Sequence, residues 1–186
     1  MLDTDTIMML VEGTRDTLYM TLMSTLFGYV LGLPMGIILT VTDKDGIRPN
    51  AAVYKVLDVI VNILRSVPFL ILLILVMPFT KAIVGKTYGS TATIVPLVIA
   101  AAPFIARMVE SSLKEVDPGV IEAAVSMGAG TGTVIWKVML AEARTSLLVG
   151  VTIAIGTILG YSAMAGTVGG GGLGDIAIRY GYHRYQ

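Results

Sequence analysis

Uncharged stretches long enough to cross a membrane alternate with short polar segments along this chain. A helix rises about 1.5 Å per residue, so roughly 20 apolar residues cross a hydrocarbon core of about 30 Å. Lys, Arg, Asp and Glu are absent from 17–42 and 145–165, and the pattern predicts two further spans between them, at 53–80 and 91–106. The chain is therefore predicted to be an all-α, polytopic membrane protein with four spans, preceded by an acidic lead-in at 1–16.

The second predicted span joins a helix with one polar stripe, 53–66, to an uncharged stretch that is too short to cross alone. Lys55, Asp58, Asn62 and Arg65 recur at spacings of three, four and three residues, which places them on one helix face. Asp58 is expected to pair with Lys55 or Asn62. Arg65 then falls inside the membrane boundary, where an ionisable side chain faces protein or water. Two interpretations of Arg65 stay open: its side chain reaches out to the interface, or it takes part in the function.

Glycines recur at every fourth position in two of the spans. Gly28, Gly32 and Gly36 predict a close contact between the first span and a neighbouring helix, and Gly156 with Gly160 predicts another in the fourth span. The alternative is that these are incidental glycines, which are common in membrane helices.

The longest polar segment, 114–143, separates the last two predicted spans. Asp117 suits the N-cap of a helix, and Pro118 suits its first position, where a missing N–H costs nothing. This helix is expected to end at Gly128, and a second helix to begin at residue 130 or 131. Small residues on the first helix allow another protein's side chains to approach its backbone: Ala123, Ala124 and Gly128.

Composition supports a membrane protein and argues against several classes of function. Of the 186 residues, 55% are hydrophobic and only 14% are charged, whereas a soluble domain exposes far more charge. The formal net charge is zero, so no basic surface for nucleic acid is expected. There is no cysteine, and the single histidine, His183, leaves little for a Ser-His-Asp triad or a multi-histidine metal site.

Two glycine-containing segments resemble nucleotide-binding motifs but lack their context. Gly85-Lys86-Thr87 has the ending of a Walker A motif, yet the required earlier glycine is Thr80. The polyglycine segment 166–174 matches G-x-G-x-x-G, yet no strand leads into it. No nucleotide site is expected, and the glycines predict tight, mobile backbone.

Within the polar segment, Glu122-Ala123-Ala124, three residues and then Gly128 resemble the EAA loop of ABC-transporter permeases. The family pattern continues with a Leu-Pro, for which this chain has Leu140 and then Ala141, so the bend before the next helix lacks its usual proline. The resemblance implies that this segment is the cytoplasmic coupling helix, which docks into a groove on an ATPase subunit. The alternative is an ordinary connecting helix.

Other segments are similar to the methionine-import permeases of bacteria, and the similarity extends from about residue 10 to 182. The segments that carry it are Arg65 to Phe69, Pro103 to Glu110, Gly160 to Gly166 with its Tyr-Ser-Ala-Met, the glycines up to Gly174, and Tyr180-Gly181-Tyr182.

This resemblance implies the type I ABC importer permease fold, with five spans per subunit. The transmembrane domain is expected to occupy 17–186, and the chain, with four spans, is expected to be truncated at its C-terminal end. The resemblance also implies a bacterial inner-membrane location, a homodimer with the transport path at the two-fold interface, and an extracytoplasmic substrate-binding lipoprotein. Two ATPase subunits bind ATP and magnesium, so this chain is expected to hold no cofactor and to catalyse no reaction. The expected substrate is methionine, and the alternative is another amino acid or small polar solute.

Tyr161 and Met164 are three residues apart and share a helix face just before the polyglycine segment. In the methionine-permease resemblance this segment approaches its two-fold mate. Met164 offers a flexible, polarizable side chain for a constriction that passes a thioether, and Tyr161 offers a ring face and a hydroxyl. Together with Arg65 they are candidates for the path and its gate. The alternative is that both residues simply pack between helices.

Two other classes of membrane protein fit the sequence less well. An ion-coupled carrier uses intramembrane acids as relays, but the spans hold no acid beyond Asp58. An intramembrane hydrolase needs a base beside a serine or a metal cluster, and His183 lies outside the predicted spans.

Overall fold

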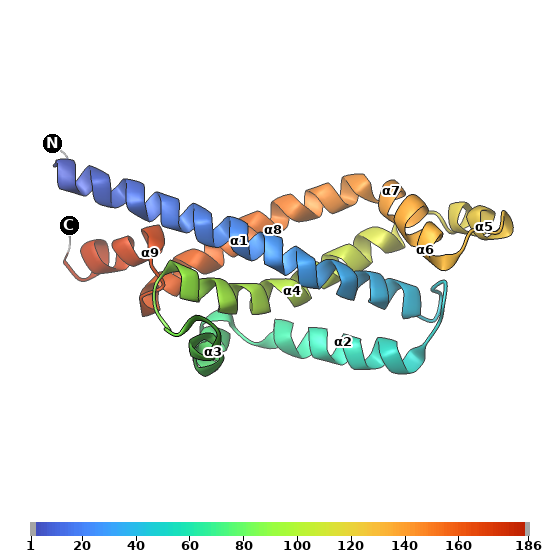
Figure 1. Cartoon of the computed structure of the whole chain (residues 1–186), viewed down its shortest axis with the longest axis horizontal. Coiled ribbons are helices and arrows are strands. Elements are labelled where there is room, and N and C mark those ends of the chain that lie inside the picture. Colours follow the sequence, from blue (N-terminus) through green and yellow to red (C-terminus); the bar gives the residue numbers. More distant parts are fainter. Residues whose placement is uncertain (1–2, 185–186) are drawn as a thin grey trace. The chain divides into compact units, whose positions relative to one another are not determined.

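The computed structural model describes residues 3–184, and these form helices and turns without a strand. Figure 1 shows the order of the helices along the chain. The elements are α1 (Thr4–Thr42), α2 (Ala51–Ser66), α3 (Phe69–Val84), α4 (Ser90–Lys114), α5 (Pro118–Ser126), α6 (Thr131–Thr133), the π-helix η1 (Val134–Met139), α7 (Leu140–Glu142), α8 (Arg144–Ala165), the 3₁₀ turn η2 (Gly166–Val168), α9 (Gly172–Ile176) and the π-helix η3 (Ala177–Tyr182). The predicted all-α class is confirmed.

The first helix is longer than the sequence pattern predicted. Of the expected lead-in at 1–16, residues 1–2 lie outside the described residues, and 4–16 are not a separate element, because α1 continues without a break from Thr4 to Thr42. Its 39 residues correspond to about 58 Å at 1.5 Å per residue, which exceeds the hydrocarbon thickness. Part of α1 therefore extends beyond the apolar layer.

The second predicted span is broken. We expected the helix at 53–66 and the uncharged stretch up to 80 to join into one span, but α2 ends at Ser66 and α3 begins at Phe69. Pro68 lies between them with φ −56° and ψ 137°. Proline has no N–H for the helix and disfavours helical geometry in the preceding residue, which explains the break.

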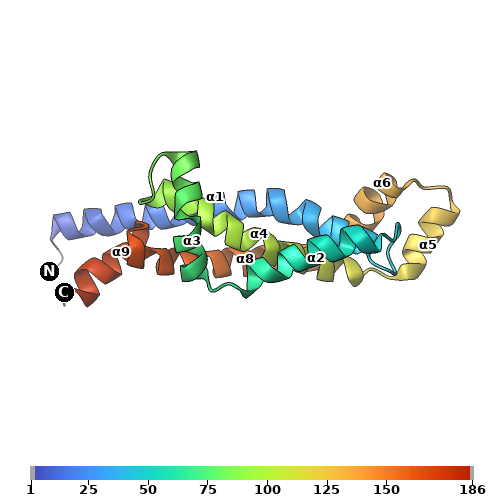
Figure 2. The ribbon, with the colours of Figure 1, turned by 90° about the horizontal axis from the view of Figure 1, so that it is seen from below.

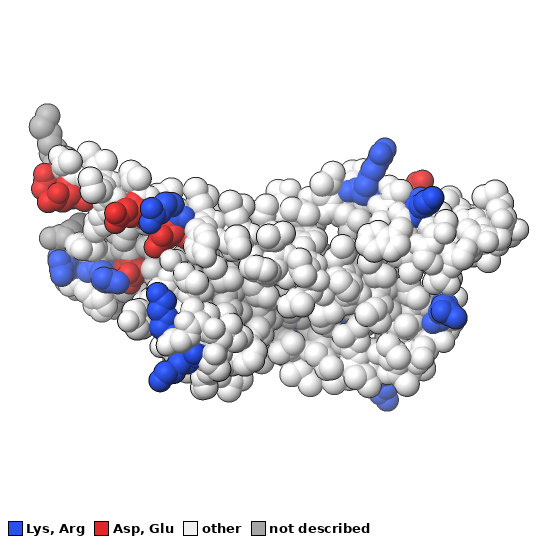
Figure 3. All heavy atoms as spheres, in the orientation of Figure 1, with Lys and Arg blue, Asp and Glu red and all other residues white. Residues whose placement is uncertain are grey.

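Within residues 3–184, three helical segments are long and apolar enough to cross a membrane: Thr4–Thr42, Ser90–Lys114 and Arg144–Val168. The bent pair of α2 and α3 makes a fourth if it counts as one broken span. On the face drawn in Figure 3, charged side chains gather over the first turns of α1 and over α9, and again near α7, while the middle stretches of the long helices are white. This is the charge pattern of helices that cross a bilayer.

The chain divides into two compact units, and several long helices contribute to both. Among the described residues the first unit contains 3–28, 67–101 and 154–184, and the second contains 29–66 and 102–153.

In the second unit, α1 and α4 approach closely through glycine. A Cβ on Gly32 would lie 2.7 Å from the carbonyl oxygen of Ala102, and one on Gly36 would lie 2.6 Å from that of Ala106. Real Cβ atoms do not come this close to a carbonyl oxygen, so only glycine permits the contact. The predicted close contact is confirmed for Gly32 and Gly36.

A small apolar core joins α1, α2 and α4 beside this contact. Leu39, Val61 and Ala106 are fully buried there, and the partly buried Met35, Tyr54 and Leu57 pack against them.

In the first unit, the polyglycine segment folds back against α1, α4 and α8. The amide of Gly89 donates to the carbonyl oxygen of Gly169 at 2.9 Å, and the hydroxyl of Thr93 donates to that of Gly170 at 3.1 Å. The hydroxyl of Thr17 accepts from the amide of Leu173 at 2.9 Å. The segment that the sequence led us to expect as mobile is thus hydrogen-bonded at three points. Figures 1 and 2 both show α9 beside the beginning of α1.

Candidate functional site

The polar segment after α4 forms the predicted helix, α5, with the predicted ends. The Asp117 carboxylate accepts a hydrogen bond from the amide of Gly119 at 2.7 Å, and Pro118 occupies the first position. After α5 the backbone of Gly128 has φ +82°, and the amide of Ala129 reaches back to the carbonyl oxygen of Ala124 at 3.1 Å. A left-handed glycine with such a return bond is a common helix end.

The second part of this segment starts where expected and bends without the missing proline. Helix α6 begins at Thr131, and the helical path continues through η1 and α7 to Glu142. Ala143 then adopts φ −76° and ψ 0°, and α8 begins at Arg144. The bend is therefore present although Ala141 stands at the proline position, so that departure from the family pattern does not remove it.

The structure changes which surface of α5 is available to a partner. Glu122, Ala123 and Gly128 are exposed, but Ala124 is buried, so it stabilises the segment rather than lining its surface. Larger apolar side chains are exposed instead: Val120, Val125, Met127 and Trp136, with Met127 82% exposed. Exposed apolar side chains gathered around one polar segment are typical of a protein-binding surface.

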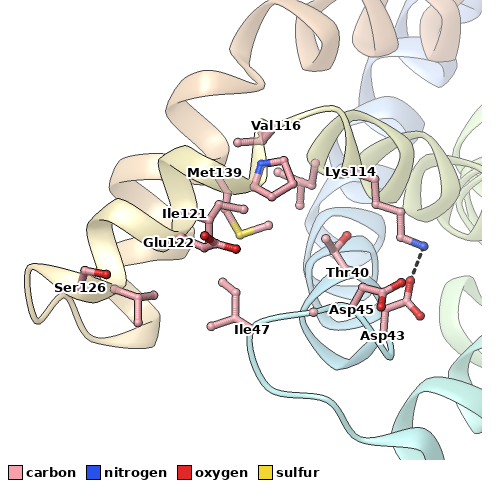
Figure 4. A pocket seen from close by; sticks show the side chains of 14 residues that line it. Thr40, Asp43, Asp45, Ile47, Lys114, Val116, Ile121, Glu122, Ser126 and Met139 are labelled. Atoms are coloured by element: carbon pink, nitrogen blue, oxygen red, sulfur yellow. Dashed lines mark ion pairs between the residues drawn. The ribbon is translucent and has the colours of Figure 1, made fainter.

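A groove of about 790 Å³ runs between α5 and the loop that joins α1 to α2 (Figure 4). From the loop, Asp43, Asp45 and Ile47 line it, and from α5, Ile121 and Glu122. Leu113, Lys114, Val116 and Met139 form more of its wall. The groove thus combines an apolar wall with carboxylates from two elements.

Beside the groove, a network of charged side chains joins α2, α4 and the loop after α1. Its centre is Glu110, which is only 4% exposed. Arg107 donates to Glu110 Oε2 at 2.6 Å, and Lys114 donates to Glu110 Oε1 at 2.8 Å. Arg107 also pairs with Asp58 on α2, and Lys114 pairs with Asp43 at 2.7 Å.

Lys114 also affects the titration of the loop carboxylate. Its hydrogen bond to Asp43 is the main cause that holds the pKa of Asp43 below its ordinary value. Asp43 is therefore ionised throughout the neutral range, and the link between loop and α4 is charged on both sides.

Only one contact beside this network was predictable from the sequence. The expected pairing of Asp58 with Asn62 is confirmed, since Asn62 Nδ2 donates to Asp58 Oδ2 at 3.2 Å. The main partner, Arg107, was missed because it comes from another helix. The available signal was the spacing of Arg107, Glu110 and Lys114, which places three charged side chains on one face of α4.

In the first unit, Tyr161 lies on α8 with its ring stacked on that of Phe69, the first residue of α3. The ring centroids are 4.7 Å apart and the planes differ by 3°. Tyr161 is half-buried, and Met164, one turn later, is 48% exposed. Tyr161 and Met164 were predicted as candidates for the path, whereas Phe69 was named only as part of the segment that carries the family resemblance.

The remaining candidates are exposed. Arg65, at the C-terminal end of α2 in the second unit, has an exposed side chain. Gly156 and Gly160 on α8 are exposed as well, and a Cβ on either would meet no atom within 4 Å. Their predicted close contact with another helix is therefore not made among residues 3–184. Between residues 3 and 184, no group of three or more metal-ligating side chains gathers as a metal site requires.

Comparison with known proteins decides the family. The model of the family described as "Binding-protein-dependent transport system inner membrane component" matches residues 32–182. The chain belongs to this family. The EAA-like segment and the bend after it lie within the matched residues, so this chain is a permease component of an ABC importer, as the sequence predicted.

Several relatives of this permease are known. The "Probable D-methionine transport system permease protein MetI" of Vibrio cholerae is 53% identical over 96% of this chain and 79% of its own length. The "D-methionine transport system permease protein MetI" of Escherichia coli K12 is 51% identical over 85% of this chain and 73% of its own length.

Solved structures agree with the fold. A chain from a crystal structure of inward-facing conformations of the MetNI methionine ABC transporter superposes with a TM-score of 0.97 at 49% identity, covering 100% of this permease and 86% of that chain. A chain from an amino acid ABC transporter crystallised with histidines superposes with a TM-score of 0.77 at 20% identity, which shows the shared fold alone. The permease therefore has the type I importer fold.

Proposed function

We propose that this chain is the membrane permease of an ATP-driven methionine importer. The observation that carries the proposal is the 53% identity, over 96% of the chain, with a relative named for D-methionine transport. The superposition on the MetNI methionine transporter, with a TM-score of 0.97, supports it. The working assembly contains two copies of this chain and two ATPase subunits that bind ATP and magnesium. An extracytoplasmic binding lipoprotein delivers methionine to the assembly in the bacterial inner membrane.

Coupling to the ATPase takes place at α5. Glu122 and Ala123 are exposed on this helix, and Val125 and Met127 add apolar side chains for a partner to cover. Closure of the ATPases moves α5, and ATP favours the outward-facing state only through contacts that differ between the two states. Gly128 acts by ending the helix in a backbone conformation that side chains rarely adopt.

The charge network carries this movement into the permease. Lys114 is the last residue of α4, three residues before Asp117 caps α5, and it is held by Asp43 and Glu110. Charge-assisted bonds of this kind are stronger and more directional than neutral ones. A shift of α5 is therefore transmitted to α4 and, through Arg107 and Asp58, to α2.

Tyr161 and Met164 line the path between the two copies of the chain. Met164 is half-exposed in the single chain, as a residue at a constriction between two copies has to be. Phe69 holds the Tyr161 ring in place by stacking. Arg65, exposed at the end of α2, is the polar candidate for the same path.

The function is tested by uptake of radiolabelled methionine into liposomes that contain this permease, its ATPase subunit and its binding protein. We expect uptake to require ATP, to persist with a protonophore, and to be competed by excess methionine but not by equal amounts of other amino acids. Competition by a different amino acid would assign the chain to that substrate. Uptake by the permease without ATPase, abolished by the protonophore, would instead show an ion-coupled carrier.

A further inference from the structure

We propose that the groove between the α1–α2 loop and α5 is a second docking site for the ATPase subunit, and that it receives a segment carrying a basic side chain beside an apolar one. The proposal rests on the proposed function, because it assigns the groove to the same partner as α5. Its new content is that residues of the loop, above all Asp45 and Ile47, contact the ATPase.

The first observation is that the loop has a fixed shape. The amide of Gly46 donates to the carbonyl oxygen of Asp43 at 2.9 Å, and the amide of Arg48 reaches back to that of Val41 at 3.0 Å. A Cβ on Gly46 would lie 2.5 Å from the carbonyl oxygen of Thr40, so the loop folds tightly onto the end of α1. Asn50 then caps α2 by accepting from the amide of Val53 at 3.1 Å.

The second observation is that the loop is fastened beside α5. Asp43 pairs with Lys114 at 2.7 Å, and Lys114 lies just before the turn into α5. Figure 4 shows Ile47 facing Ile121 and Glu122 across the groove. A groove whose two walls are already fixed costs little conformational entropy when a partner binds. The groove is therefore preformed rather than an opening in a flexible loop.

The third observation concerns charge. Four ionisable residues line the groove: Asp43, Asp45, Glu122 and Lys114. Lys114 is paired with Asp43, which leaves the carboxylates of Asp45 and Glu122 on opposite walls. Asp45 has only a loose contact with Lys44, at 3.7 Å, and both side chains are more than 80% exposed. The groove therefore presents negative charge to a partner that approaches α5.

The walls below these carboxylates are apolar. Ile47, Ile121, Val125 and Met139 line them. An apolar wall with a negative rim fits a protein segment in which a Lys or Arg neighbours an apolar residue. Anionic lipid headgroups are repelled by the same carboxylates. The groove is continuous with α5, so a partner that covers α5 is the one that reaches it.

The absence of cysteine from this chain makes a direct test simple. Ile47→Cys is labelled with a maleimide photocrosslinker in the reconstituted complex with the ATPase subunit, and the crosslinked product is mapped by mass spectrometry. Ala123→Cys on α5 is the positive control, and Lys55→Cys, which is exposed on α2 and does not line the groove, is the negative control. We expect Ile47→Cys to crosslink to an ATPase segment that contains Lys or Arg.

Each other outcome overturns the proposal in a distinguishable way. Crosslinking of Ile47→Cys to lipid or to a second copy of the chain assigns the groove to another occupant. If Ala123→Cys crosslinks to the ATPase and Ile47→Cys does not, the groove is not a docking site, but the proposed function stands. Failure of both removes the proposed function as well.

A second measurement tests the charge. We expect Asp45→Lys to weaken binding of the ATPase subunit roughly tenfold at low salt and less at high salt, because exposed charges are screened. Asp5→Lys, an equal charge reversal on the exposed first turn of α1, serves as the control and is expected to bind normally. Equal binding by the two variants at low salt would contradict the proposed basic segment.

Discussion

In the second unit a network of charged side chains joins separate elements beside the glycine contact of α1 with α4, whereas in the first unit the polyglycine segment brings backbone atoms together. Glu110, Arg107 and Lys114 connect α4 to α2 and to the loop after α1. In the first unit, Gly166 and Gly174 lie directly against backbone atoms of neighbouring segments, and Gly172 lies against Thr17. The second unit contains α5, and the first contains Tyr161 and Met164.

This difference indicates how each unit tolerates change. Charge-assisted hydrogen bonds are directional, and their donors can change acceptors during a movement. This suits a part of the molecule that transmits motion from another subunit. Close backbone contacts have no such freedom, because even one added methyl group has to displace main-chain atoms. We therefore expect substitutions in the polyglycine segment of the first unit to cause unfolding, and substitutions in the charge network of the second unit to act first by loss of charge pairing.

The largest effect is expected for Gly172→Val in the first unit. Gly172 has φ +73°, and a Cβ there would lie 2.6 Å from Thr17 Oγ1 and 2.9 Å from Met20 Cε. Strain and overpacking together are expected to destabilise the protein by roughly 3–5 kcal/mol. Gly181→Val is the matched control, since that site is exposed and has no neighbour within 4 Å. Equal thermal unfolding midpoints of the two detergent-purified variants would show that close packing does not hold this unit together.

Next in size is Glu110→Ala in the second unit. The change leaves the partly buried Arg107 and the exposed Lys114 each without one carboxylate partner, and breaking a pair with the buried Glu110 costs about 3 kcal/mol. Glu115→Ala, at an exposed glutamate, is the control. Thermal unfolding in detergent measures both variants. If Glu110→Ala loses no more thermal stability than Glu115→Ala, the charge network does not stabilise this unit.

Met164→Ala is expected to have a small effect on stability and a larger one on transport. Because Met164 is 48% exposed, its removal is expected to cost roughly 1 kcal/mol. If it lines the constriction, the variant leaks methionine from loaded liposomes in the absence of ATP. Leu148→Ala, also exposed on α8, is expected not to leak. A strongly destabilised Met164→Ala protein that does not leak would support packing between helices instead.

The smallest effect is the pH dependence of the bond between Asp43 and Lys114. The folded protein holds the pKa of Asp43 below the ordinary value of 3.8, so this bond stabilises the protein fully above that value. Its contribution is lost as the pH falls through the lowered pKa. Asp43→Asn is therefore expected to lower the unfolding free energy by less than about 1 kcal/mol at neutral pH. The difference from wild type is expected to vanish in strong acid. If the difference in unfolding free energy between Asp43→Asn and wild type grew as the pH fell, the pKa of Asp43 would not be lowered in the folded protein.

The sequence predicted elements whose signals are local. Asp117, Pro118 and Gly128 mark the ends of α5, and each acts within a few residues of itself. The coupling role that the family resemblance implies for this helix stays a prediction. The apolar runs predicted four spans, and three of them are unbroken helices. Pro68 breaks the remaining one, because the effect of a proline on the preceding residue outweighs an apolar pattern.

What the sequence did not predict depends on contacts between elements. Arg107 meets Asp58 across 49 positions, and Phe69 meets Tyr161 across an even longer separation. No spacing rule connects such residues, since the helices that carry them are placed by the fold as a whole. The burial of Ala124 was missed as well, since burial depends on packing that no local pattern predicts.

The central claim is that α5 couples ATP hydrolysis by a partner to transport by this chain, and Gly128 tests it most directly. Gly128 and Gly130 both have open space where a Cβ would lie, but only Gly128 has positive φ, whereas Gly130 is extended with φ −69° and ψ 158°. The measurement is methionine taken up per ATP hydrolysed by reconstituted complexes that carry Gly128→Val or Gly130→Val. We predict a ratio reduced by roughly tenfold or more for Gly128→Val, since a β-branched residue strains this backbone, and a nearly normal ratio for Gly130→Val. Normal coupling in the Gly128→Val complex would contradict the account.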